Sequence, residues 1–168
     1  MARRWQSPVI RGRNGADCTP RIATMDMRQT VDSLCSRYGT RDPYELCSAL
    51  DVTVLTVDLP DKVDGFYLAI HGCGFIFLSQ ALDGWQARII CAHELGHALL
   101  HPALNSRFLS EETNFVTERY EREADEFCAH LLLEELPEEL KSRDSLTAEE
   151  ISGATGLPLS LIKLRFHL

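Results

Sequence analysis

The 168-residue sequence contains no run of about 18 apolar residues, which a membrane-spanning helix would need. Its first residues lack the apolar core of a secretion signal, and its six cysteines include no C-x-x-C pair. It also has no internal repeat and no low-complexity tract. These absences argue against membrane association and favour a cytoplasmic protein in a reducing compartment. The 45% of apolar residues suffice for one sizeable core.

Positive charge is scarce beyond the first 24 residues. The net charge is −8, yet residues 1–23 carry five arginines against one aspartate and show no hydrophobic period. We therefore predict that residues 1–24 form a disordered basic arm; the alternative is that translation begins at Met25 or Met27, where the first patterned segment starts. The acidic remainder argues against direct nucleic-acid binding and favours a basic protein partner.

Hydrophobic spacing and turn residues predict an α+β fold. A helix over residues 27–38 should end at Gly39, and a second should begin at Pro43 with Asp42 as its cap. We expect three strands, at residues 52–59, 65–70 and 74–79, the last two joined by a glycine turn at residues 71–74. These strands should form a small, mainly antiparallel sheet packed against a helical core.

The sequence His93-Glu94-Leu95-Gly96-His97 is the most informative motif in the chain. Apolar residues continue before and after it, which predicts that it lies in the middle of a buried helix. Positions i and i+4 share one helix face, so both imidazoles can reach one tetrahedral zinc ion. Glu94 would lie beside the metal and take a proton from zinc-bound water, as in a metallopeptidase. The alternative, two ordinary histidines on a helix, would be costly to bury without partners.

A catalytic zinc site needs a third protein ligand and an open position for water. A metzincin would have glycine at position 100 and histidine at position 103, where this chain has Leu100 and Ala103. His101 continues the spacing of His93 and His97, but one straight helix cannot wrap three ligands around a single ion. We therefore expect His101 to support the site or to lie at the surface.

A second predicted helix, over residues 118–129, offers the third ligand. The order Glu121-x-x-Ala124-Asp125 resembles the downstream motif of gluzincin-type peptidases, in which the glutamate binds zinc and the aspartate hydrogen-bonds a ligating histidine. That resemblance implies Glu121 as the ligand and Asp125 as the supporting residue. Glu123 stays an alternative ligand because it is only two residues away, and a solvated acidic helix is the other interpretation.

Together the two helices resemble those of the ImmA/IrrE family of metallo-endopeptidases. The similarity is strongest in residues 92–101 and 121–132 and extends over roughly residues 27–140. It implies a zinc-dependent endopeptidase that cleaves a regulatory protein, a helix-turn-helix repressor of a phage-like or mobile element or of a stress response.

The resemblance also assigns the site residues. It implies zinc ligands at His93, His97 and Glu121, and a catalytic base at Glu94. Three departures concern the surroundings of the site: Asp125 replaces a common asparagine, Cys128 replaces an alanine, and Leu133-Glu134 replaces the usual Met-Pro. None of them removes a catalytic group.

Other segments carry expectations about substrate binding. The strand over residues 74–79 directly precedes the zinc helix, so we expect it at a sheet edge beside the cleft, where an extended substrate can pair with it; a plain core strand is the alternative. Tyr67 and Tyr120 are candidates for a phenol that stabilises the oxyanion. The polar connection over residues 102–116 could act as a lid.

We thus predict three regions: the arm 1–24, a peptidase domain over residues 25–140, and a short C-terminal helical pair over residues 141–168 that packs on the domain or docks a partner. Besides a zinc endopeptidase, the alternatives are a partner-binding regulator with a structural zinc site and a DNA-associated switch that uses the arm and the tail. Glu94 separates the first two, because a structural site has no use for a base. Salt-sensitive DNA binding would indicate the third.

Overall fold

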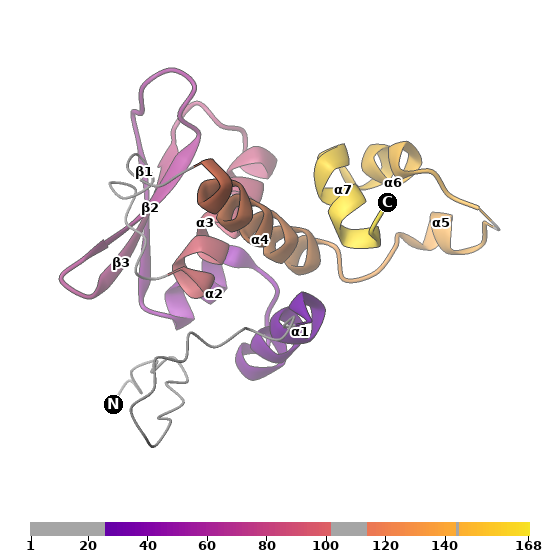
Figure 1. Ribbon diagram of the computed structural model, residues 1–168, viewed down its shortest axis with the longest axis horizontal. Coiled ribbons are helices and arrows are strands. Elements are labelled where there is room, and N and C mark those ends of the chain that lie inside the picture. The colour runs from indigo at the N-terminus through magenta and orange to yellow at the C-terminus, as the bar shows by residue number, and fades with distance from the viewer. Residues whose placement is uncertain (1–25, 102–113, 144) are drawn as a thin grey trace.

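The computed structural model describes residues 26–101, 114–143 and 145–168, which form seven helices and one three-stranded sheet. In Figure 1 the sheet lies at one end of the molecule, α3 and α4 occupy the middle, and α5, α6 and α7 lie at the other end. The elements are α1 (Met27–Tyr38), α2 (Pro43–Ala49), β1 (Val52–Val57), β2 (Gly65–Ile70), β3 (Cys73–Ser79), α3 (Gly84–Leu100), α4 (Asn114–Leu132), α5 (Glu138–Lys141), α6 (Ala148–Thr155) and α7 (Leu159–Phe166). The predicted α+β class is confirmed.

The first two helices begin and end where their sequences predict. The Asp26 carboxylate caps α1, and Gly39 ends that helix in the left-handed region with φ of 72°. The Asp42 carboxylate accepts from two backbone N–H groups at the start of α2, and Pro43 occupies the first helical position. Arg88 of α3 also pairs with Asp42, so this cap ties α2 to the helix that carries the central motif.

The sheet is mixed, with the strand order β1-β3-β2. β2 and β3 form the predicted antiparallel hairpin, in which His71 and Gly72 take positive φ values of 51° and 81° at the turn. β1 runs parallel to β3. The expectation that β3 is an edge strand is wrong: it is the central strand and pairs on both sides, which explains its apolar run. β2 is the edge strand that also packs against α3.

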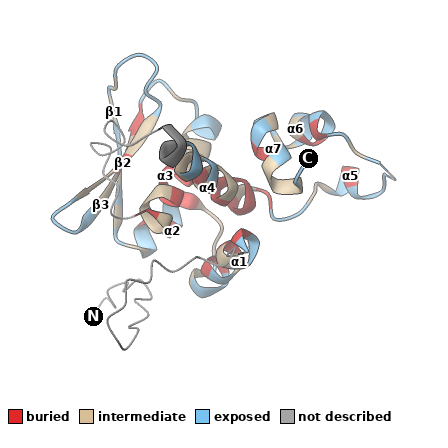
Figure 2. Cartoon of the chain, viewed as in Figure 1, coloured by how far each residue is buried: buried red, intermediate tan, exposed pale blue. Residues whose placement is uncertain are grey.

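The helices α3 and α4 pack directly against each other and carry much of the core, as the buried segments in Figure 2 show. Gly96 of α3 lies at a close approach of the two helices. A Cβ at Gly96 would lie 3.1 Å from the Ala124 Cα and 3.2 Å from the Phe127 ring. Small residues at positions 96 and 124 therefore set the distance between the helices, and with it the distance between the side chains that they present to each other.

Packing of α7 on α4, together with a hydrogen bond to α3, joins the C-terminal helices to the rest of the fold. Thr147 and Glu150 form a capping box at the start of α6, as the capping residues predict. α7 packs against α4, with Leu161 and Ile162 in the core. The Trp85 indole N–H donates to the Gly156 carbonyl at 3.0 Å. This hydrogen bond joins the first turn of α3 to the connection between α6 and α7.

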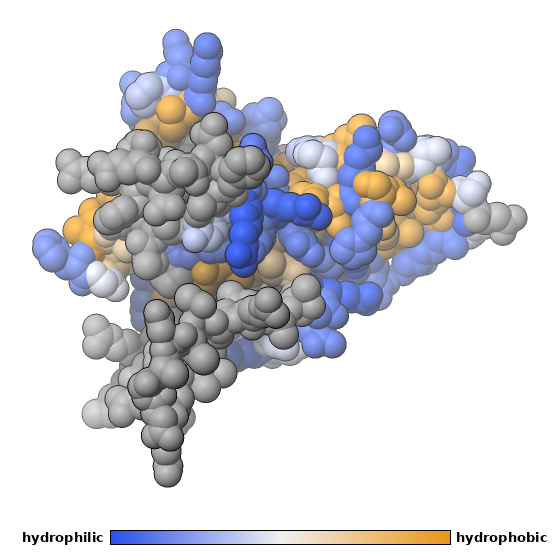
Figure 3. Space-filling view, viewed as in Figure 1, coloured by the Kyte–Doolittle hydropathy of each residue, from blue (hydrophilic) through white to orange (hydrophobic). Residues whose placement is uncertain are grey.

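Two predicted segments lie outside the described residues: the basic arm over residues 1–24, and residues 102–113 of the proposed lid. In the part of the chain that the structure describes, no helix is long and apolar enough to cross a membrane. Figure 3 shows hydrophilic side chains over the middle of one face, between the sheet and the C-terminal helices, and hydrophobic side chains among those helices.

Candidate metal centre

The position of the histidine motif follows from how α3 begins and what it buries. Asp83 and Gln86 form a capping box that starts the helix. From there one face of α3 enters the core, with Leu95 fully buried. His93 and His97 lie one turn apart beside this face, with ring centroids 4.7 Å apart. Because both are fixed to a buried helix, their relative orientation is set before any ligand binds.

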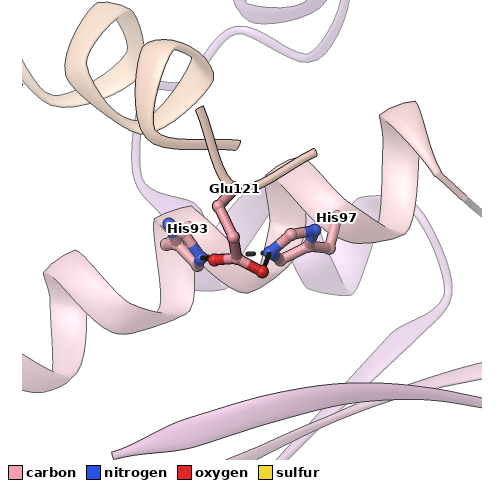
Figure 4. A group of neighbouring side chains, drawn as sticks. All are labelled: His93, His97 and Glu121. Carbon is pink, nitrogen blue, oxygen red and sulfur yellow. Dashed lines mark hydrogen bonds and ion pairs between the residues drawn. The ribbon is translucent and has the colours of Figure 1, made fainter. Parts of the chain in front are cut away.

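Glu121 of α4 completes a group of three donors with the two histidines (Figure 4). The Nε2 atoms of His93 and His97 are 3.0 Å apart. The Glu121 carboxylate oxygens lie 3.3 Å from the His93 Nε2 and 3.5 Å from the His97 Nε2. Metal–ligand bonds of about 2.0–2.1 Å in a tetrahedron give edges of about 3.3 Å. The separations are close to that value, with a different Glu121 oxygen nearest each histidine, so these three side chains could hold one tetrahedral cation. Among the described residues no other such group occurs.

Asp125, one turn after Glu121, orients His93. Its carboxylate lies 2.8 Å from the Nδ1 of His93, so the Nδ1–H donates to Asp125 and the Nε2 faces the other donors. Burial acts to lower the pKa of His93, but the hydrogen bonds with Asp125 and Glu121 outweigh it and raise that pKa to about 10. The same contacts with the two histidines lower the pKa of Glu121 strongly. The site is therefore built to hold positive charge.

Glu94 is the only charged residue of α3 that is buried, with 8% of its surface exposed. Burial raises the pKa of its carboxyl, and the charges of His93 and His97 offset this only in part. The backbone N–H of Tyr67 in β2 faces the carboxylate and acts to lower its pKa. A carboxylate with a raised pKa beside a cation site has the properties of a general base.

The structure separates the roles of Glu121 and Glu123. Glu121 faces His93 and His97, whereas Glu123 lies 3.3 Å from the His101 Nε2 and 2.8 Å from the Arg119 guanidinium. His101 is buried, as expected for a residue that supports the site, and its ring is 5.9 Å from that of His97. Burial lowers the pKa of His101, so the ring is neutral at neutral pH.

The two tyrosines named from the sequence lie in different places. Tyr120 packs its ring 4.4 Å from that of His101. The Tyr67 side chain is buried, and its hydroxyl lies toward Gly74 of the central strand. What Tyr67 brings to the site is its backbone N–H, which reaches Glu94. Sequence patterns carry no signal for this contact, because it depends on where β2 lies relative to α3.

A comparison with known protein families shows to which family the chain belongs. Residues 47–167 match the family described as the IrrE N-terminal-like domain, Peptidase_M78. The chain belongs to this peptidase family. The resemblance inferred from the two helices is thereby confirmed, and the match includes all of α6 and α7.

Two relatives cover most of the chain. One relative is the uncharacterized immunity region protein 2 of Bacillus phage phi105. It is 32% identical to this chain over 139 residues, which cover 83% of this chain and 88% of the relative. Metallopeptidase ImmA of Bacillus subtilis (strain 168) is 27% identical over 142 residues, covering 79% of each chain. The family and these names imply a metal ion, and the three-donor group is where this chain could bind it.

Proposed function

We propose that this protein is a zinc-dependent endopeptidase that cleaves a regulatory protein, a helix-turn-helix repressor. The observation that carries the proposal is the combination of three converging donors with a buried carboxylate one residue after the first donor. A structural zinc site is closed by four protein ligands, whereas a catalytic site keeps one position open and needs a base beside it. The described residues supply three donors and the base.

Each residue has a defined task in this proposal. His93, His97 and Glu121 hold the zinc ion, and Asp125 fixes the His93 ring. Bound zinc supplies a Lewis acid that polarises the scissile carbonyl and lowers the pKa of water to about 7. Glu94 accepts the proton of the attacking water at its carboxylate and donates it to the departing nitrogen.

The extended substrate would pair with the edge of β2 that faces away from β3. This strand is paired only with β3 among the described strands and packs against α3. Its Tyr67 N–H reaches the Glu94 carboxylate, which brings the strand next to the base. A peptide added to this edge would therefore lie with its backbone alongside Glu94. In this proposal β2 takes the substrate-pairing role that the sequence predicted for β3.

Two features support a regulatory protein as the substrate. The name of the phage relative associates that protein with immunity, and the sequence beyond residue 24 is acidic, which would attract a basic DNA-binding protein. The proposal includes a cytoplasmic location for this protein and a repressor as its substrate.

The first experiment measures zinc per chain by elemental analysis in the parent and in two matched variants, Glu121→Ala and Glu123→Ala. We expect about one zinc per parent chain, loss of zinc in Glu121→Ala, and retention in Glu123→Ala. A parent that cannot be loaded with zinc would overturn the proposal. Loss of zinc only in Glu123→Ala would move the third ligand to that residue.

The second experiment tests catalysis with Glu94→Gln. The protein is incubated with purified helix-turn-helix regulators from its own genome, and products are identified by mass spectrometry. We expect the parent to cut one regulator at one site, and Glu94→Gln to bind zinc but leave that regulator intact. Equal cleavage by both proteins would refute the role of Glu94 as base. A regulator bound by both proteins and cleaved by neither would favour the partner-binding alternative.

A further inference from the structure

The sheet has two faces, and only one of them belongs to the core. Successive side chains of a strand point to opposite faces, and the registers of β1 with β3 and of β2 with β3 align the two sets across all three strands. One set, which includes Ile76 and Leu78, is buried in the core. The other set forms what we call the outer sheet face, and none of its large apolar side chains is part of the core. They are Leu55, Phe66, Leu68, Ile70, Phe75 and Phe77.

The described helices that pack on the sheet lie on its inner face. α3 contacts β2 and β3, and α2 contacts both β1 and α3. Cys47 of α2 and Cys91 of α3, whose sulfur atoms are 3.9 Å apart, lie together in the core. On the outer sheet face Leu55 is 39% exposed and Ile70 is 41% exposed, and the four other apolar side chains are half-buried. Contiguous apolar surface of this kind marks an interaction site on a folded protein.

Three aromatic rings make the outer sheet face rigid. Phe66 and Phe77 stack with ring centroids 4.8 Å apart, and Phe75 and Phe77 stack at 6.4 Å. All three rings are attached to paired strands, so their positions are set before a partner binds. None of the six apolar residues offers a charge or a side-chain hydrogen bond. A polar ligand placed here would lose its hydration without gaining a partner, so the occupant must present an apolar surface.

The size of the outer sheet face limits what can occupy it. Its strands have six or seven residues, and strands about 4.8 Å apart then give a footprint of roughly 15 by 20 Å, or about 300 Å². A stable interface between two proteins buries about 800 Å² on each partner, so two copies of this face would fall short even if side-chain relief doubled the area to about 600 Å². A single α-helix of about four turns is roughly 20 Å long and 10 Å wide. One helix therefore matches the face, whereas a second copy of the chain does not.

Exposed aspartates lie at one end of the outer sheet face. Residues 58–64 connect the end of β1 to the start of β2, and the Ser79 N–H at the end of β3 donates to the Asp64 carbonyl at 2.8 Å. This connection is therefore at the same end of all three strands. It carries Asp58, Asp61 and Asp64, all exposed, against a single lysine. A partner with basic residues at that end would be attracted, and an acidic one would be repelled.

We propose that the outer sheet face docks an amphipathic helix of a partner protein, with basic residues at the end of that helix that meets Asp58, Asp61 and Asp64. The apolar stripe of the helix would lie on the phenylalanine rings, which is the general way in which amphipathic helices bind apolar surfaces. Because α3 lies on the other side of the sheet, the docked partner leaves the metal donors and the base uncovered. The inference does not rest on the proposed peptidase function.

The test measures binding of synthetic peptides to the full chain by isothermal titration. The first peptide has about 18 residues, with leucines at the spacing of one helix face, lysines confined to one end and glutamines elsewhere. The second has the same composition with its leucines spread around the helix, and the third has glutamates in place of the lysines. We expect the first peptide to bind at least about tenfold more tightly than the second and at least about threefold more tightly than the third.

Two neighbouring positions of β1 provide matched variants. Leu55→Glu places a charge on the outer sheet face, whereas Thr56→Glu places the same charge at the next residue, which is exposed and belongs to the opposite face. In Leu55→Glu the docked helix would bury the new carboxylate, so the affinity for the first peptide should fall at least about tenfold. In Thr56→Glu it should stay within about twofold of the parent. Ile70→Glu repeats the test on β2, and circular dichroism checks the fold of each variant.

Other results would overturn the proposal. Equal binding of the first and second peptides, or no binding of either, would show that no amphipathic helix docks on this face. An affinity that is unchanged in both Leu55→Glu and Ile70→Glu, or lost equally in Thr56→Glu, would place the peptide elsewhere. Equal or tighter binding of the third peptide would refute the basic character of the partner. In sedimentation velocity, a dimer of the parent that Leu55→Glu dissociates would show that a second copy occupies the face.

Discussion

Replacing Asp125 tests whether the metal centre depends on a residue that does not touch the metal. The Asp125 carboxylate is 2.8 Å from the His93 Nδ1 and fixes the ring so that Nε2 faces the other donors. In Asp125→Ala the ring can rotate, and the proton can move to Nε2, where it blocks the metal. Loss of such a contact typically costs about 10- to 100-fold in metal affinity.

The structure narrows that range. The Asp125 side chain is 37% exposed, so solvent screens part of its interaction with His93. We therefore expect zinc affinity to fall about 10- to 30-fold in Asp125→Ala. In Asp125→Asn the amide oxygen can still accept from Nδ1, but a neutral hydrogen bond is about half as strong as a charged one. We expect a loss of roughly three- to sixfold for that variant.

Zinc affinity is measured by competition with a chromophoric chelator at one neutral pH. Glu126→Ala serves as the matched control, because Glu126 is the next residue of α4 and is absent from the donor group. Its affinity should equal that of the parent. The reasoning fails if Asp125→Ala stays within twofold of the parent, or if Glu126→Ala loses as much affinity as Asp125→Ala.

Three further predictions concern the frame around the site. Gly96→Ala should lower the free energy of unfolding by about 1 kcal/mol in urea titrations, because the new Cβ crowds the Ala124 backbone. This crowding should cost more than the better helix propensity of alanine contributes. An unchanged or higher free energy of unfolding would contradict the prediction. Burial and Arg165 lower the pKa of His130 to about 4, so below pH 6.5 the unfolded state binds a proton that the folded state does not. The free energy of unfolding should therefore fall by about 3 kcal/mol between neutral pH and pH 4. In thermal melts His130→Gln should lose less stability than the parent over that range. Trp85→Phe should cost about 0.5–1.5 kcal/mol in the same melts by removing the hydrogen bond to the α6–α7 connection, and no change would contradict that role.

Local signals in the sequence predicted the helices well. Asp42 and Pro43 placed the start of α2, and Gly39 placed the end of α1, because caps and stops depend on a few neighbouring residues. The His93–His97 spacing predicted the face of α3 in the same way. Strand order depends on contacts between distant segments, so turn and cap residues do not place β3 between the other two strands. The apolar run of β3 favours a central position and is the one local signal for it.

The sequence could not decide whether Glu121 or Glu123 joins the two histidines as the third donor, for a different reason. Both glutamates reach a histidine of α3: Glu121 meets His93 and His97, and Glu123 meets His101. Each therefore fits the pattern of a carboxylate beside an imidazole, and only the crossing of the two helices decides which histidine each one meets.

The site follows from how the two helices pack. α3 presents His93, His97 and His101 at intervals of four residues, and α4 brings the carboxylates of Asp125, Glu121 and Glu123 to them. The spacing of these two rows is set by Gly96 against Ala124, a contact that involves no functional side chain. A larger side chain there would push the carboxylates away from the histidines by a few tenths of an ångström. Because metal–ligand bonds tolerate deviations of only about 0.2 Å, the packing of small residues is as much a part of the metal centre as the ligands themselves.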